Sequence, residues 1–192
     1  MNKVLKNILI FLACIIVSLV AFRIYIYELS MRIIPRFVTD NDLWINLLII
    51  IAFAFLLYTI IQIILLKYIP KWTVVILYIF YFMFLFYALF LKNIGVRGFD
   101  LDPFNTLTYI EYGEIVSILN IFMLVPLGFI VKLNWKNLLL VTLSITAVEI
   151  CQYVFSLGIF DTGDIITNVL GYIIGALIAM SPLGKKVKSY IR

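Results

Sequence analysis

The stretch that decides the fold is AVEICQYVFSLGIFDTGDIITNVLGYIIGA, residues 147–176. Most of its residues are apolar enough for lipid, yet Glu149, Asp161 and Asp164 interrupt the run. A carboxylate at mid-depth in a membrane costs about 2–3 kcal/mol on insertion scales. Two questions follow for the rest of the sequence: whether the chain as a whole is suited to a membrane, and why acidic residues are present in such an apolar stretch.

Composition predicts an integral membrane protein. Of the 192 residues, 65% are hydrophobic and 13% are charged, whereas soluble domains are roughly 45–50% apolar and about 25% charged. The net charge of +5 comes from short basic clusters between apolar runs. That pattern reflects membrane topology rather than a phosphate-binding face, so we expect no nucleic-acid partner.

The residue types present limit the kinds of catalytic and metal site that the chain can form. The chain contains no histidine, which excludes imidazole metal ligands and histidine-based nucleophilic triads. Its two cysteines, Cys14 and Cys151, lie in different apolar runs and are expected to be small buried side chains. The sequence predicts neither a metal site nor a cofactor.

Six apolar runs are long enough for helices of about 20 residues. They lie at 4–26, 43–66, 72–91, 114–132, 137–157 and 164–182. The first run is longer than a signal-peptide core and no cleavage site follows, so we expect a retained helix. The predicted fold class is an all-α polytopic membrane helix bundle with six transmembrane helices.

Loop charges predict the orientation of these helices. The N-terminus, the connections at 67–71 and 132–136, and the C-terminal tail carry basic residues without acidic ones. The positive-inside rule therefore predicts that both termini are cytoplasmic. We expect an N-terminal two-helix region at 1–71, a membrane core at 72–182 and a basic cytoplasmic tail at 183–192.

The fifth predicted helix carries polar residues along one face. Thr142, Thr146, Glu149, Gln152 and Ser156 are spaced by three or four residues, which places them on the same side of a helix. This helix is expected to run outward. Glu149 then lies roughly 12 Å below its outer end, at about 1.5 Å per residue.

The sixth predicted helix shows a second stripe. Asp161, Asp164, Asn168, Gly171 and Gly175 follow one another at steps of three or four residues. The glycines form a ridge of small residues, which allows a neighbouring helix backbone to approach closely. We therefore expect this helix to press its glycines against another helix.

The polar residues of the last three helices converge at one depth. Asn120 on the fourth helix, Glu149 and Asn168 all fall in the outer half of the bilayer, beneath a 92–113 loop that we expect to be irregular. We predict one polar pocket that opens outward. Its ligand-binding residues are expected to be Arg97, Asn120, Glu149, Gln152, Asp161, Asp164 and Asn168.

Purely structural roles would also account for some of these residues. Asn120 and Gln152 could provide interhelical hydrogen bonds worth about 0.6 kcal/mol each. Arg97 could be an interfacial anchor, and Asp161 and Asp164 could cap the sixth helix. Such roles explain a deep glutamate less well, because glutamine would form the same hydrogen bonds at lower cost.

With these residues in view, the segment 97–175 resembles the VanZ family of bacterial membrane proteins. The matching pieces are Arg97 followed by "DPFNTL", then "NIFMLVPLGF", "EICQ" and "FDTGDIITNVLGYIIG". An arginine often found before the Phe-Asp pair is replaced here by Gly158 and Ile159. The resemblance implies a bacterial plasma-membrane protein associated with low-level resistance to teicoplanin and other glycopeptide antibiotics.

Three functions are open at this point, besides a purely structural or partner-binding role. The first is a pocket that binds an amphiphile, such as a lipid-linked peptidoglycan precursor or a lipoglycopeptide, with membrane lipids as further partners. The second is an enzyme acting on a lipid-linked substrate, with Glu149 as general base or with Glu149 and Asp164 holding a divalent cation. The third is a small transporter, which the nearly apolar cytoplasmic halves of the last three helices disfavour. The oligomeric state is also open.

Overall fold

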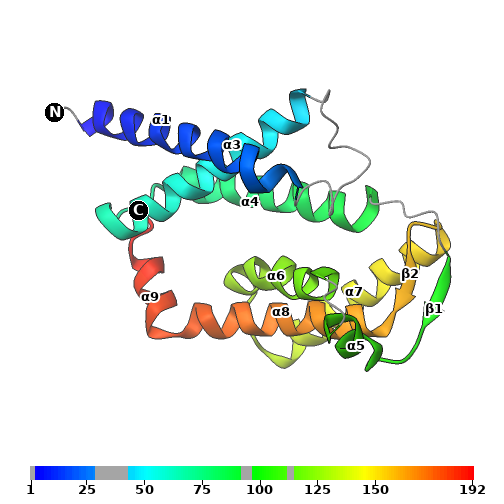
Figure 1. Cartoon of the computed structure of the whole chain (residues 1–192). Coiled ribbons are helices and arrows are strands. Elements are labelled where there is room, and N and C mark those ends of the chain that lie inside the picture. The colour runs from blue at the N-terminus through cyan, green and yellow to red at the C-terminus, as the bar shows by residue number, and fades with distance from the viewer. Residues whose placement is uncertain (1–2, 29–42, 92–96, 112–114) are drawn as a thin grey trace. The chain divides into compact units, whose positions relative to one another are not determined.

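The computed structural model describes residues 3–28, 43–91, 97–111 and 115–192, most of them helical (Figure 1). The elements in chain order are α1 (Lys3–Ala21), η1 (Phe22–Ile26), α3 (Leu43–Ile61), η2 (Gln62–Leu66), α4 (Lys71–Phe86), η3 (Tyr87–Leu91), β1 (Gly98–Asp100), α5 (Asn105–Glu111), α6 (Ile115–Ile130), α7 (Trp135–Val154), β2 (Ile159–Asp161), α8 (Thr162–Met180) and α9 (Pro182–Ser189). The three η elements are π-helical ends of the long helices that precede them.

Among the residues that the structure describes, five helices are long and apolar enough to cross a membrane. They comprise Leu5–Ile26, Asn46–Leu66, Lys71–Phe90, Trp135–Val154 and Thr162–Met180. The fourth predicted run forms a shorter apolar helix, Ser117–Ile130, and its expected start at Glu114 lies outside the described residues. Most of the predicted outer connections, 29–42 and 92–96, lie outside them as well. Large apolar side chains such as Ile16 and Leu143 are exposed, as in helices that face lipid.

The chain forms two compact units, each described here by itself. Unit 1 is Met1–Phe82 with Val187–Arg192, and unit 2 is Met83–Lys186. The predicted boundary after residue 71 and the predicted tail at 183–192 stay predictions.

In unit 1, α1 and α3 pack around a small apolar core of Cys14, Ala54 and Tyr58. The buried hydroxyls of Ser18 and Thr59 each donate to a carbonyl four residues earlier in the same helix. Their hydrogen bonds are thus satisfied locally, and the contact between the two helices is made by apolar and aromatic side chains.

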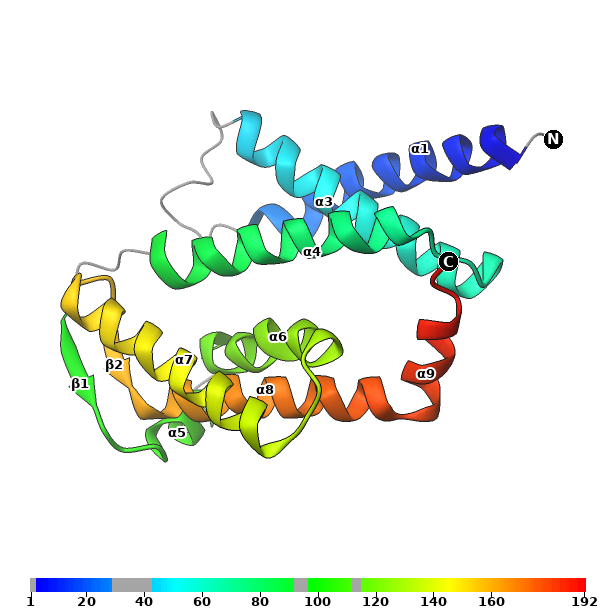
Figure 2. The same cartoon turned by 180° about the vertical axis from the view of Figure 1, so that it is seen from behind.

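In unit 2, α6, α7 and α8 surround a core of Leu124, Val141, Ile145 and Tyr172 (Figure 2). Tyr172 is fully buried. Its hydroxyl donates to the carbonyl of Lys132, which lies in the connection between α6 and α7, at 3.0 Å. The tyrosine therefore fixes α8 to the turn between the other two helices.

Glycines bring α6 and α8 into backbone contact. A Cβ added to Gly171 would overlap the carbonyl of Ile121, and one added to Gly175 would overlap the carbonyl of Val125. Gly128 lies in the same way against the backbone of α8. Because both contact pairs advance together along the chain, α6 and α8 run in the same direction, side by side in both views. The predicted ridge of small residues is confirmed.

The strands β1 and β2 are an addition to the predicted all-α fold. They form a two-stranded parallel sheet. Gly98 is aligned with Ile159, and Asp100 with Asp161. The segment expected to be an irregular loop is thus fixed, from Gly98 onward, beside the chain that leads into α8.

Candidate functional site

The candidate site lies where α7 ends and α8 begins, and its deepest member is Glu149. Only 2% of Glu149 is exposed. It continues a buried stripe of α7 that passes through Val141 and Ile145, so it faces the protein interior and not lipid. The hydroxyls of Thr142 and Thr146, two residues of the predicted polar face, donate to carbonyls of their own helix. The glutamate therefore reaches the site from an otherwise apolar stripe.

Asp161 connects this glutamate to α8. It is the N-cap of α8, with an extended backbone, and its Oδ1 accepts a hydrogen bond from the Gly163 N–H at 2.7 Å. The Asp161 N–H points to Oε2 of Glu149 at 3.4 Å. Burial raises the pKa of the Asp161 carboxyl above its ordinary value, and the nearby charge of Asp100 adds to the rise. Asp161 therefore both caps α8 and belongs to the candidate site.

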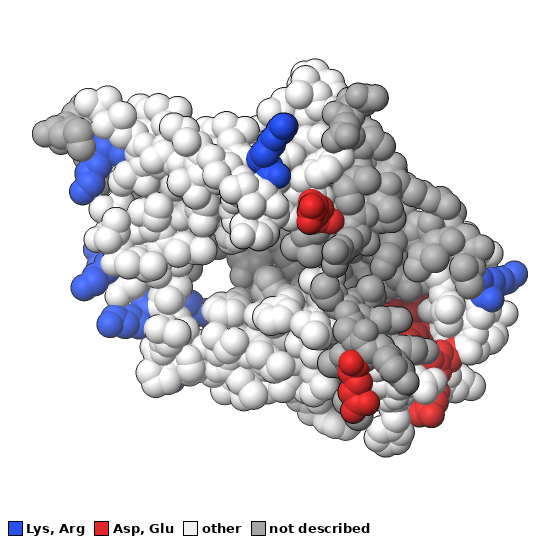
Figure 3. All heavy atoms as spheres, in the orientation of Figure 1, with Lys and Arg blue, Asp and Glu red and all other residues white. Residues whose placement is uncertain are grey.

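The site gathers carboxylates from four elements, α7, α8, β1 and β2. Glu149 interacts electrostatically with Asp164, in the first turn of α8, and with Asp161. Asp100 at the end of β1 is the aligned partner of Asp161. Acidic side chains gather over the region of α5 and β1 in Figure 3. Within the described ranges, no three or more Cys, Asp or Glu side chains are disposed to hold a metal ion.

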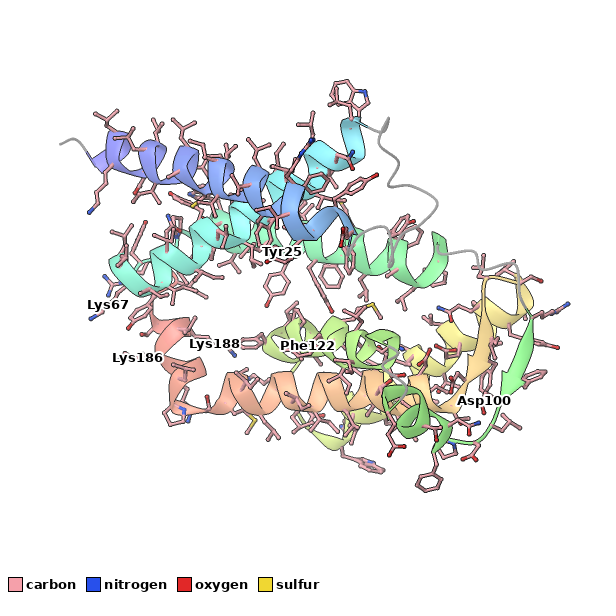
Figure 4. The ribbon with its side chains drawn as sticks, in the orientation of Figure 1. Tyr25, Lys67, Asp100, Phe122, Lys186 and Lys188 are labelled. Carbon is pink, nitrogen blue, oxygen red and sulfur yellow. The ribbon has the colours of Figure 1, made fainter. Side chains whose placement is uncertain are left out.

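Asp100 organises the segment that follows β1. Its two carboxylate oxygens accept from Nδ2 of Asn105, the first residue of α5, at 2.9 and 3.0 Å. Oδ1 also accepts from the Asp102 N–H at 3.1 Å. The Asp100 carbonyl accepts from the Thr162 hydroxyl at 3.4 Å. Asp100 thereby links β1 to the starts of both α5 and α8, and Figure 4 labels it at this junction.

A close contact seats α5 on the first turn of α8. A Cβ added to Gly163 would overlap the buried hydroxyl of Thr106. Sequence reasoning missed Asp100 and Thr106 as members of this arrangement. The available signal was the alternation of apolar and acidic residues in "GFDLD", which is typical of a strand with two different faces.

Arg97 meets the end of α7 through aromatic rings. Its guanidinium lies 4.6 Å from the ring centroid of Tyr153, which is one helical turn beyond Glu149. The Phe99 ring is 4.1 Å from the Tyr153 ring and 5.8 Å from that of Phe160. Arg97 is exposed, and its contact with Tyr153 places it at the end of α7. Tyr153 and Phe99 are further site residues that sequence reasoning missed.

Gln152 is engaged elsewhere. Its Nε2 donates to the carbonyl of Leu89 at 2.9 Å, within the π-helical segment η3. This bond ties α7 to the chain that precedes β1. The structure therefore brings Gln152 to η3 rather than to the carboxylates.

Two asparagines lie deeper along α6 and α8. Asn168, one turn after Asp164, is 3% exposed, and its Oδ1 has no hydrogen-bond partner among the described residues. A buried unsatisfied polar atom costs about 1–3 kcal/mol. Asn120 is half-buried on α6. The contact of Ile121 with Gly171 places Asn120 within about one turn of Asn168 along the helix axes.

Comparison with known sequences now bears on this arrangement. The sequence model of the VanZ/LLP1 family matches residues 72–183, more than half of the chain. The chain belongs to the VanZ/LLP1 family. All seven predicted site residues fall within the matched region of this family member.

A curated relative extends the comparison. The chain is 29% identical over 90 residues to Protein VanZ of Enterococcus faecium. The alignment covers 43% of this chain and 53% of the relative, so the chain spans about half the length of that protein. No solved structure matches this VanZ/LLP1 family member.

Proposed function

We propose that this VanZ/LLP1 family member is a multi-pass protein of the bacterial plasma membrane with six spanning helices. Both termini are cytoplasmic, and the carboxylate site faces outward. The five helices of spanning length and the basic connections at 67–71 and 132–136 support this topology.

Reporter fusions test the topology directly. Fusions after Lys67, Lys136 and Arg192 should read cytoplasmic, and a fusion after residue 105 should read external. A fusion at Arg192 that reads external would overturn both the orientation and the outward site.

We propose that the site binds the polar part of an amphiphile, a lipid-linked cell-wall precursor or a lipoglycopeptide, and thereby contributes to low-level teicoplanin and glycopeptide resistance. The observation that carries the proposal is the burial of Glu149 beside Asp161 and Asp164. An ionisable residue within a spanning helix is costly and marks a functional site by default. A stable helix contact alone does not require three neighbouring acids.

The chemistry of the site favours a ligand rich in hydrogen-bond donors. Glu149, Asp161 and Asp164 offer carboxylate oxygens, and Asn168 adds a buried amide oxygen that has no partner within the described ranges. All of these are acceptors when the acids are ionised. Sugar hydroxyls and peptide N–H groups are the matching donors, and both occur in cell-wall precursors and in glycopeptides.

The remaining parts of an amphiphile have matching surfaces nearby. The exposed ring of Phe99, stacked on Tyr153, offers an apolar face at the end of α7. The exposed Arg97 guanidinium is a partner for an anionic group such as a diphosphate or a carboxylate. Exposed apolar side chains of the spanning helices would lie against the lipid tail.

Substitution of Glu149 tests the function. Glu149→Ala should abolish the gain in teicoplanin resistance that expression of the protein confers, with protein abundance unchanged. Glu111→Gln, at an exposed acid of α5, is the matched control and should leave resistance unaltered. Full resistance with Glu149→Ala at normal abundance would refute the role of the site.

Glu149→Gln separates binding from catalysis. A glutamine retains hydrogen bonding but cannot accept a proton as a base. In a binding protein this variant keeps part of the resistance, with weakened affinity. If Glu149 is instead the general base of an enzyme on a lipid-linked substrate, the variant should bind ligand and yet be as inactive as Glu149→Ala. The proximity of Asp164 and Asp161 to a buried glutamate is the observation that keeps this second candidate in view.

A further inference from the structure

Backbone hydrogen bonds in unit 1 join the last residues of the chain to the connection between α3 and α4. The Ile69 N–H donates to the Tyr190 carbonyl at 2.8 Å, and the Arg192 N–H donates to the Ile69 carbonyl at 3.0 Å. The Lys71 N–H donates to the Arg192 carbonyl at 3.1 Å. These bonds form a parallel bridge that pairs Ile69 with Ile191.

The bridge concentrates positive charge at its surface. Ile69 is 2% exposed, whereas the side chains of Lys67, Lys71, Lys188 and Arg192 are exposed. We call these four residues the basic bridge; Figure 4 labels Lys67 and Lys188. Lys67 ends the preceding helix with a left-handed backbone, at φ 48°. Its position is therefore set by a defined turn rather than by a variable loop.

The basic bridge lies at the level of lipid headgroups. One apolar spanning helix ends at Leu66, and the next begins at Lys71, so the short connection between them is where the chain leaves the hydrocarbon. Trp72, next to Lys71, is 55% exposed, as is usual for tryptophans at a membrane interface.

The charges of the basic bridge have no acidic residues beside them in the sequence. Neither residues 43–91 nor residues 165–192 contain an aspartate or a glutamate. The first turn of α4 adds the positive end of a helix dipole at Lys71. The positive-inside rule requires only that basic residues flank the spans. It does not require the backbone pairing that brings Lys71 and Arg192 together.

We propose that the basic bridge binds the phosphate of an anionic phospholipid headgroup, such as phosphatidylglycerol or cardiolipin. The exposed cations lie within two or three residues of a hydrogen-bonded backbone pairing, and the adjacent helices offer apolar surface to the acyl chains. Basic clusters directly beside a spanning helix are characteristic sites for anionic headgroups.

Lipid binding to the purified full-length chain in neutral detergent tests the proposal. Phosphatidylglycerol, counted by native mass spectrometry, should bind more tightly than phosphatidylcholine. The triple variant Lys67→Gln, Lys71→Gln, Lys188→Gln should weaken phosphatidylglycerol binding at least roughly tenfold, because each basic side chain near an anionic surface contributes about fivefold. The control triple Lys6→Gln, Lys132→Gln, Lys136→Gln removes the same charge and should leave binding nearly unchanged.

Three results would overturn the proposal. Equal losses in the two triples would mean that only net charge matters. Equal binding of the two lipids would remove the preference for an anionic headgroup. Competition by inorganic phosphate as effective as that by phosphatidylglycerol would indicate a site for a free anion. If the glutamine triple lowers thermal stability, the triple Lys67→Arg, Lys71→Arg, Lys188→Arg should keep both fold and affinity, and its failure to bind would also count against the proposal.

Discussion

The two units differ in how far some of their buried polar groups reach. In unit 1, Ser18 and Thr59 donate to carbonyls of their own helices, four residues away. In unit 2, buried or half-buried polar groups reach distant parts of the chain, as Gln152 does to Leu89 and Tyr172 to Lys132. These two hydroxyls of unit 1 therefore stay within one helix, whereas Gln152 and Tyr172 of unit 2 fix elements relative to one another.

The helix–helix contacts of the two units also differ in the groups that form them. The α1–α3 contact is made by side chains, with Ala54 and Tyr58 against Cys14. The α6–α8 contact is made by backbone at glycines. Side-chain contacts can adjust to substitution, but a backbone contact cannot. The precise geometry of unit 2 is what a site with several fixed carboxylates requires.

The largest effect should come from the glycine contact. Gly175→Ala places a methyl group against the Val125 carbonyl and should lower the free energy of unfolding by about 2–3 kcal/mol, as overpacking does. In an open helix the same change would stabilise by about 0.5–1 kcal/mol. Thermal unfolding in detergent measures the difference. Gly98→Ala is the control, since its Cβ would make only ordinary contact with Ile159, at 3.8 Å. Equal stability of both variants would show that the glycine contact does not contribute to stability.

Tyr172→Phe should cause a smaller loss in the free energy of unfolding. The variant removes the hydroxyl that donates to the Lys132 carbonyl and leaves that carbonyl without this donor. The expected loss is about 1–1.5 kcal/mol, measured by denaturant or thermal unfolding. Tyr25→Phe, at a tyrosine that is 75% exposed, should have little effect. A neutral Tyr172→Phe would show that α8 is held to the α6–α7 turn by packing alone.

Substitution of Asp161 should reveal both its role as the N-cap of α8 and a pH dependence of stability. Asp161→Ala removes the acceptor of the Gly163 N–H and should cost about 1 kcal/mol, whereas Asp161→Asn keeps an acceptor. Burial raises the Asp161 pKa above its ordinary value of 3.8, so the folded state binds this proton more tightly than the unfolded chain. The contribution of Asp161 to stability therefore falls as pH rises from the ordinary pKa to the raised one. Asp161→Asn should remove that slope in melts across this pH range, and an unchanged slope would assign it to another group.

The smallest expected effect concerns Arg97 and Tyr153. An exposed cation–π pair is worth about 0.5–1 kcal/mol. A double-mutant cycle with Arg97→Gln and Tyr153→Leu should return a coupling energy of that size in thermal unfolding. A coupling energy of zero would show that the cation–π contact does not help to hold the β1 segment, which would then depend on its strand pairing.

Regular spacing allowed the helical part of the site to be predicted. The steps from Asp164 through Asn168 to Gly171 and Gly175 predicted one face of α8, and the structure confirms the glycine contact. The isolated acid Glu149 predicted a buried position, because lipid would not accept it. Helical periodicity is local, so these features could be read without knowing the neighbours.

The parts that could not be predicted depend on distant segments. β1 and β2 have three residues each, too few for a reliable alternation, and their pairing joins segments that lie far apart in the sequence. Gln152 was expected at the carboxylates, but spacing on one helix does not reveal that η3 offers the Leu89 carbonyl. For Thr142 and Thr146, spacing predicted a shared helix face but could not show that their hydroxyls donate within their own helix.

The parallel alignment of Gly98 with Ile159 also bears on the order of assembly. A parallel pair cannot close as a hairpin, because a crossover must first be made between its strands. Here that crossover contains α5, α6 and α7. During synthesis β1 thus emerges well before β2 and cannot pair with it until α7 has been made. Pairing of the segment that follows Arg97 is therefore a late step in the folding of unit 2, which requires the chain as far as β2.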